Sequence, residues 1–177
     1  MKRLIPGLAL VGLLLAFLPM PSAAAGDNTA TTLFPVDEAT QLETHSFVNC
    51  HGGGNCDFVA GTNLRTPDGP AGFPPGLWAR QATEIRSNNR LAYLDAHATS
   101  QFERVHKEGG TDTITTVYFG EGPPDKYQTT GVINSTSWAT GQPMSANTLV
   151  YVCTHMQVVY PGVNLTSPST CAQTPIT

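Results

Sequence analysis

Asp95 and His97 stand two positions apart and carry the side chains of general acid–base chemistry. On a β-strand they share one face, where the Asp95 carboxylate could orient the His97 imidazole as a base. On a helix they would diverge by about 200° and the pair would not form. A two-residue turn at Asn88-Asn89 would place Arg80 opposite His97. That face is then polar, which favours solvated cross-strand pairing over catalysis.

Residues 51–54 read His-Gly-Gly-Gly, which resembles the oxyanion-hole loop of lipases and esterases. In those enzymes, backbone N–H groups of the loop stabilise a tetrahedral intermediate. The chain has no Gly-x-Ser-x-Gly nucleophile motif, which argues against that class of enzyme. Because the glycines lie between Cys50 and Cys56, a chain reversal inside a small disulfide loop explains them sufficiently.

The histidines lack the spacing of a metal site, and no cofactor-binding motif is present. A metal site would require distant residues to converge, as they would if the segment around His51 packed near His155. His155 is itself a candidate site residue, since it follows directly on an apolar half-strand. The five histidines are His45, His51, His97, His106 and His155.

The two tryptophans, Trp78 and Trp138, are candidate binding residues because an indole combines a large apolar ring with a polar N–H. If both are exposed on one surface, they form a platform suited to sugars or apolar ligands. Packing in the core is the more common place for such rings.

A mainly β fold must position these residues. The longest run of β-branched and aromatic residues spans 148–160, and alternate positions from Val150 to Tyr160 form a nearly continuous apolar face. Turns rich in glycine and proline recur about every ten residues. We therefore expect an antiparallel β-sandwich or barrel of six to eight strands, with at most one short helix. Further strands are expected at 56–66, 77–87, 111–119 and 127–138, with a last edge strand within 165–177.

Residues 90–106 fit two structures. As a helix, Leu91, Leu94 and Ala98 would lie on one apolar stripe, ended by Gly109-Gly110. The alanines favour that helix, whereas the surrounding β pattern favours a strand. We prefer a short strand over 91–98.

The start of the chain has the pattern of a secretory signal peptide. Lys2-Arg3 precede an apolar run from Leu4 to Leu18, and small residues precede Gly26. The run is shorter than the roughly 20 residues of a membrane span. No cysteine near position 25 could carry a lipid anchor. Residues 1–25 are thus expected to direct secretion, followed by a flexible arm over 26–44 and one β domain over 45–177.

The four cysteines of an exported chain are expected to form two disulfides. We favour Cys50–Cys56, closed by the glycine-rich loop, and Cys153–Cys171, which would tie the central strand to the tail. Crossed pairing between early and late cysteines remains open. The net charge of −4, without a cluster of basic residues, excludes typical nucleic-acid binding.

Two stretches, 77–81 and 157–165, carry a resemblance to known proteins. They read Leu-Trp-Ala-Arg-Gln and Gln-Val-Val-Tyr-Pro-Gly-Val-Asn-Leu. Together with the signal peptide and two disulfides, they resemble small exported proteins of actinobacteria, mycobacteria included. The resemblance implies a compartment and no particular chemistry.

The leading hypothesis is a secreted, non-enzymatic β domain that binds an unknown ligand or partner at or outside the cell envelope. Its loops over 67–76, 120–125 and 141–147 could present the binding surface. One alternative is a small secreted hydrolase that uses Asp95, His97 or His155 with a second carboxylate. Another is an extracellular inhibitor with a disulfide-braced loop. The sequence does not reveal the oligomeric state.

Overall fold

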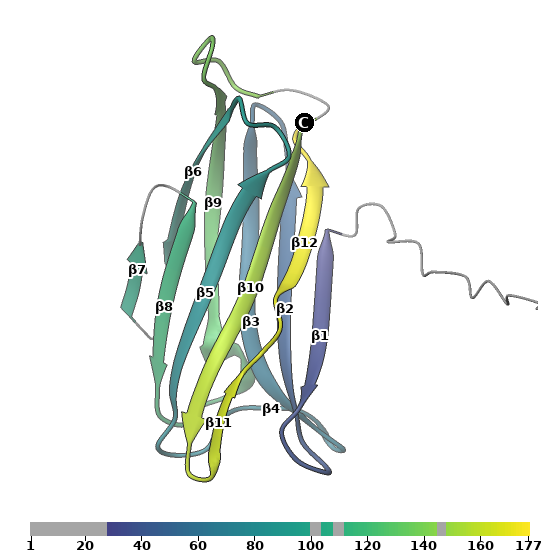
Figure 1. The fold of residues 1–177 in the computed structure, drawn as a ribbon, viewed down its shortest axis with the longest axis vertical. Helices are drawn as coiled ribbons and strands as arrows, with labels where there is room; N and C mark the ends of the chain where they lie inside the picture. The colour runs from purple at the N-terminus through teal and green to yellow at the C-terminus, as the bar shows by residue number, and fades with distance from the viewer. Residues whose placement is uncertain (1–27, 100–103, 108–111, 145–147) are drawn as a thin grey trace, which may run out of the picture.

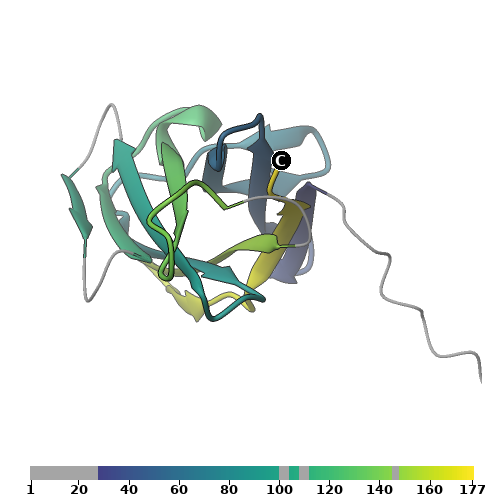
Figure 2. The same ribbon diagram turned by 90° about the horizontal axis from the view of Figure 1, so that it is seen from above.

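The computed structural model describes residues 28–99, 104–107, 112–144 and 148–177. They form two antiparallel β-sheets of six strands each, stacked face to face (Figures 1 and 2). The expected antiparallel β-sandwich is confirmed. The predicted signal peptide, residues 1–25, lies outside the described residues. Across these described ranges, no helix is both long and apolar enough to cross a membrane.

Sheet A contains most of the first half of the chain. Its strand order is β1-β2-β3-β9-β6, and β4 pairs with the end of β3. Its strands are β1 (Thr29–Pro35), β2 (Gln41–Cys50), β3 (Asn55–Thr66), β4 (Gly69–Ala71), β6 (Ala92–Thr99) and β9 (Gln128–Ser137).

Sheet B is built around β10 (Leu149–Tyr160), the strand with the longest β-forming run. β10 pairs with β5 (Trp78–Ser87) on one side, and with β12 (Thr170–Pro175) and β11 (Val163–Thr166) on the other. β8 (Thr113–Phe119) and β7 (Arg104–Lys107) extend the sheet beyond β5. The short 3-10 helix η1 (Pro124–Tyr127) leads into β9. Even-numbered residues of β10 from Val150 to Val158 are buried, as the period of two predicted.

The described residues form twelve strands, more than the six to eight expected. Short strands account for much of the difference: β4, β7 and β11 have three or four residues each. The predicted arm over 26–44 is not loose along its length, because β1 docks on β2 through the pairs from Thr29–Phe47 to Pro35–Gln41. The strand preferred for residues 91–98 is confirmed as β6.

The hairpin considered across Asn88-Asn89 does not form. β5 has β10 on one edge and β8 on the other, so no edge is left for β6. The chain crosses instead from sheet B to sheet A, where β6 pairs with β9 and His97 lies opposite Val132. Arg80 therefore faces Gln157 and Val117 rather than His97. Turn residues alone could not reveal that later segments occupy both edges of β5.

Both favoured disulfides form, Cys50–Cys56 and Cys153–Cys171. Each joins residues directly opposite one another, the first across β2 and β3 and the second across β10 and β12. Two such bonds are typical of an oxidising, extracellular setting.

A layer of buried polar side chains divides the core into two apolar clusters. One cluster contains Phe58 and Ile85, and the other contains Tyr127 and Met156. Hydroxyl groups between the clusters join the two sheets, as where Thr44 Oγ1 lies 2.6 Å from Thr170 Oγ1. We call this set the polar layer. It consists of Thr44, Ser46, Thr62, Gln81, Thr83, Thr116, Thr129, Thr154 and Thr170.

Replacing Thr129 should measure what the polar layer contributes. Thr129 Oγ1 of sheet A lies 2.7 Å from both Thr116 Oγ1 and Tyr118 Oη of sheet B. Thr129→Val keeps the side-chain shape but removes a partner from two buried hydroxyls, so we expect a loss of about 1–3 kcal/mol in the free energy of unfolding. Thr130→Val, at the neighbouring exposed position, should change it by less than about 0.5 kcal/mol. Urea unfolding measures both variants, and equal effects would contradict a structural role for the layer.

Candidate functional site

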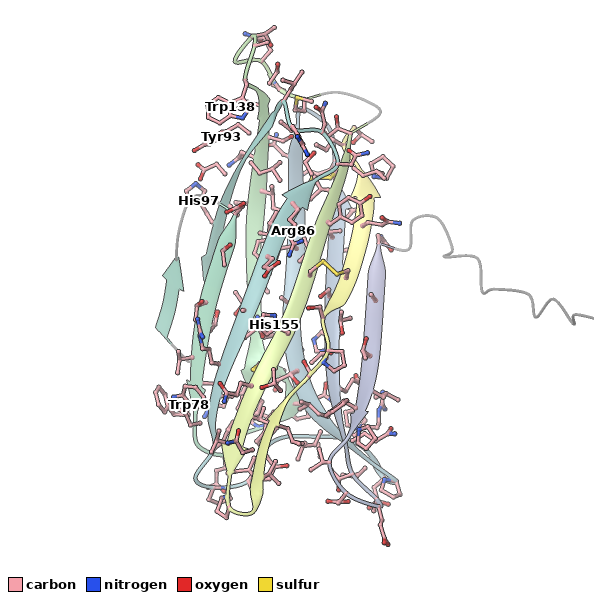
Figure 3. All side chains as sticks on the ribbon, in the orientation of Figure 1. Trp78, Arg86, Tyr93, His97, Trp138 and His155 are labelled. Carbon is pink, nitrogen blue, oxygen red and sulfur yellow. A yellow bond between two sulfur atoms is a disulfide. The ribbon has the colours of Figure 1, made fainter. Side chains whose placement is uncertain are left out.

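Trp138 has the most exposed large apolar side chain of the described residues. It directly follows β9, and 66% of its surface is exposed. Its ring packs edge-on against Tyr93 of β6, with ring centroids 4.8 Å apart (Figure 3). Both rings line a cleft of about 380 Å³, which we call the apical cleft. The polar and aromatic residues that line it are Arg86, Ser87, Asn89, Arg90, Tyr93, Asp112 and Trp138.

Asn89 organises the chain that forms one wall of the apical cleft. Its Oδ1 accepts a hydrogen bond from the Leu91 N–H at 3.0 Å, and its Nδ2 donates to Thr148 Oγ1 at 3.3 Å. The Trp138 N–H in turn donates to the Leu91 carbonyl at 2.8 Å. The segment that crosses between the sheets is thereby held against the end of β9. This is why Tyr93 and Trp138 meet.

Two arginines and one aspartate line the apical cleft beside the aromatic pair, in a chain with a net charge of −4. Arg86 lines the apical cleft but pairs with Glu84 on its own strand. Arg90 is exposed and makes no ion pair with another described residue. Asp112 adds one carboxylate to the lining. Arg90 is therefore the basic group most available to a ligand.

Trp78 lies at the opposite end of the sandwich from Trp138 (Figure 3). It opens β5 on the outer face of sheet B, half-buried, and pairs in register with Val159 and Phe119. The two tryptophans therefore do not share the platform considered from the sequence. Trp78 stands at the start of β5, whereas the other end of that strand, at Arg86, reaches the apical cleft beside Trp138.

The loops expected to present a binding surface are divided between the two ends. Loops 67–76 and 120–125 pack on each other near Trp78. A Cβ on Gly72 would overlap the Gly122 carbonyl, and the Gly120 N–H bonds the Leu77 carbonyl. Residues 141–144 lie near Trp138, where the Gly141 N–H donates to the Ser137 carbonyl at 2.8 Å. Only this third loop adjoins the apical cleft.

Asp95 and His97 do lie together on β6. His97 Nε2 is 2.9 Å from Asp95 Oδ2, and the side chains are 61% and 34% exposed, respectively. His97 borders a shallow depression of about 490 Å³ that also includes Val132 and Thr130. Within the described part of the chain, no hydroxyl or thiol forms a hydrogen bond with His97. The pair orients a surface imidazole but places no nucleophile beside it.

The N–H groups of His51, Gly52 and Gly54 in the His-Gly-Gly-Gly segment are engaged within the fold. The Gly52 N–H donates to Thr177 Oγ1 at 3.0 Å, and the Gly54 N–H approaches the Thr177 carbonyl at 3.4 Å. Gly54 itself is required, because a Cβ there would lie 2.6 Å from the Ser135 carbonyl oxygen. These donors hold the end of the described chain and are not directed at a substrate.

The histidines considered for a metal site do not converge. His155 lies on the outer face of sheet B, opposite Ala82. His45 lies on sheet A, and His51 Nδ1 is 3.8 Å from the carboxylate of Asp57. Among the residues that the structure describes, no group of three His, Cys, Asp or Glu could hold a metal ion.

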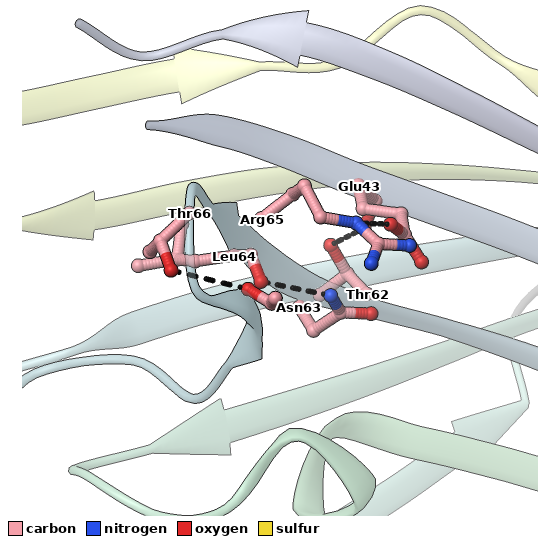
Figure 4. A network of polar contacts seen from close by, with 7 residues as sticks. Glu43, Thr62, Asn63, Leu64, Arg65 and Thr66 are labelled. Carbon is pink, nitrogen blue, oxygen red and sulfur yellow. Dashed lines mark hydrogen bonds and ion pairs between the residues drawn. The ribbon is translucent and has the colours of Figure 1, made fainter. Parts of the chain in front are cut away.

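A second set of polar contacts surrounds Glu43 of β2 (Figure 4). Arg65 Nε donates to Glu43 Oε2 at 2.7 Å, and Thr62 Oγ1 donates to the Glu43 carbonyl at 2.7 Å. His45, two residues from Glu43, lies over Gly61, where a Cβ would come within 2.5 Å of His45 Nε2. Burial lowers the pKa of His45, and the nearby Glu43 charge opposes that shift. The glycine thus makes room for a neutral imidazole in the sheet surface.

The sequence did not single out Tyr93, Arg90 or Asn89 as parts of a site with Trp138. Tyr93 and Trp138 are far apart in the sequence, and only the pairing of β6 with β9 brings them together. The sequence did contain one local indication of this site. Two asparagines, an arginine and Leu91 stand between two strands, which is typical of a loop that carries function.

Comparisons with known proteins add little to this geometry. No family model matches the sequence, and no curated protein matches it. Among solved structures, the chain is similar to a crystal structure described as a yeast GGA1 GAE domain, with 5% identity and a TM-score of 0.35. The similarity covers 82% of this chain and 97% of the other. A likeness this weak carries no argument about function.

His45 should make the fold less stable in mild acid. Since its pKa is lower in the folded than in the unfolded chain, its contribution to stability is present above the unfolded pKa and is lost as pH falls through the folded one. We expect His45→Gln to remove that loss, so the stability difference between wild type and variant should change between pH 7.5 and pH 5. Urea unfolding at both pH values measures it. A difference that is the same at both values would contradict the burial of His45.

Proposed function

We propose that this chain is an exported, non-enzymatic β-sandwich that binds a ring-shaped ligand of the cell envelope in the apical cleft. One observation carries the proposal: Trp138 is 66% exposed and is held by Tyr93 at the mouth of a cleft. An exposed indole costs free energy in water, and it is characteristic of surfaces that bind partners or ligands.

The size of the apical cleft supports a small ligand. Its volume of about 380 Å³ is within the range of roughly 300–1,000 Å³ for small-molecule sites. A stable protein interface buries about 800 Å² on each partner. The exposed large apolar residues described at this end are Leu91 and Trp138, and half-buried Tyr93, Met144 and Leu149 lie near them. One or two rings fit this surface better than a protein partner does.

Export is supported by two independent features. Residues 1–25 have the order of a signal peptide, with basic, apolar and then small residues. The two disulfides are typical of a chain that matures in an oxidising compartment. The resemblance of residues 77–81 and 157–165 to exported actinobacterial proteins supports the envelope as the place of action.

A second candidate function, a small secreted hydrolase, is favoured by the 2.9 Å contact between Asp95 and His97. It predicts turnover of an activated ester such as p-nitrophenyl acetate. Turnover that is lost in His97→Ala and kept in His51→Ala would favour the hydrolase over the binding proposal.

Cosedimentation should reveal the binding function. The full chain, exported to and purified from a bacterial periplasm, is mixed with delipidated actinobacterial cell-wall sacculi. We expect the chain to sediment with the sacculi. Trp138→Ala should lose at least about tenfold in affinity, or about 1.4 kcal/mol, because the indole supplies the main apolar contact with the ligand. Trp78→Ala is the matched control, because Trp78 lies at the other end of the molecule, and it should bind like wild type. Equal binding by the two variants would contradict the proposal.

A further inference from the structure

On the basis of the proposed function, we infer that the apical cleft selects an acidic saccharide, one whose sugar ring carries a carboxylate of the hexuronic-acid type. The aromatic pair supplies the ring contact, and Arg90 supplies the charge contact.

The aromatic pair is suited to a sugar ring. The Tyr93 and Trp138 planes meet at 67°, an edge-on contact that holds the indole while most of its surface stays exposed. A pyranose ring presents C–H groups on one face and hydroxyls at its edge. The C–H face can pack on the indole, and the edge can reach polar groups of the cleft such as Asp112.

Arg90 supplies the preference for an anion. A guanidinium has five donors in a plane and binds a carboxylate through two parallel hydrogen bonds. Arg86 lines the same cleft, but Glu84 already neutralises it. Because Arg90 makes no ion pair with another described residue, a ligand carboxylate need not displace a partner from it.

The charge of the whole chain limits the ligand to few negative groups. The chain has thirteen acidic and nine basic residues. A long polyanion would extend from the cleft over an acidic surface and be repelled. A single uronic acid in an otherwise neutral saccharide satisfies Arg90 without that penalty.

The test uses three disaccharides that differ at one carbon: cellobiouronic acid, its methyl ester and cellobiose. The chain carries Trp78→Phe, so that fluorescence reports on Trp138 alone. We expect the acid to change the emission with at least about tenfold higher affinity than the ester or cellobiose, since a hydrogen bond to a charged group is the stronger kind.

Arg90→Gln should lower the affinity for the acid by about tenfold and leave the two neutral sugars unchanged. Arg90→Lys should retain part of the preference, and Arg80→Gln, an exposed arginine outside the cleft lining, should retain all of it. Equal affinities for the three sugars, or an Arg90→Gln variant that still prefers the acid, would overturn the inference that the ligand is acidic. Either result would be compatible with a cleft that binds a neutral ring. No change in Trp138 emission with any sugar at millimolar concentration would overturn the acidic-saccharide inference. If the chain still sediments with the sacculi and Trp138→Ala weakens that binding, the broader proposal of a ring ligand would stand.

Discussion

Hydrogen bonds buried between the sheets fix how the two halves of this sandwich stack. On the inner face of several strands, a threonine lies between two apolar residues at alternate positions, as in Val152, Thr154 and Met156. Sliding one sheet along the other would bury these hydroxyls against apolar side chains without partners, at a cost of about 1–3 kcal/mol for each. The apical cleft depends on this stacking, because Arg86 comes from sheet B whereas Tyr93 and Trp138 come from sheet A. The layer is not fully satisfied, since Gln81 Oε1 and Thr154 Oγ1 have no partner among the described residues.

Local patterns in the sequence were enough to predict much of the fold. The period of two in residues 148–160 predicted both the strand and its buried face, and cysteine spacing predicted both disulfides. Pairing was not predictable, because the partners of β6 and β5 lie later in the chain. The Tyr93–Trp138 contact follows from that non-local pairing. The sequence could not predict this contact for the same physical reason, although Trp138 itself was a candidate.

Several residues with chemical potential are used by the fold itself. The glycine-rich loop directs the Gly52 and Gly54 N–H groups at Thr177, and His45 fills the space over Gly61. Asp95 and His97 pair with each other on a solvent-exposed edge strand. The apical cleft differs from these sites, since Trp138 remains exposed after every contact that holds it in place. Binding in this cleft is therefore a more economical account of the surface than catalysis on β6.

The binding of a ring ligand over Trp138 is tested most directly by NMR of the two indole N–H groups. Spectra of the ¹⁵N-labelled chain are recorded while solubilised cell-wall saccharide fragments are added, and the signals are assigned with a Trp78→Phe variant. We expect the Trp138 signal to shift saturably, whereas the Trp78 signal, from the opposite end of the sandwich, should stay in place. A shift of Trp78 alone, or no shift of either signal, would contradict this binding.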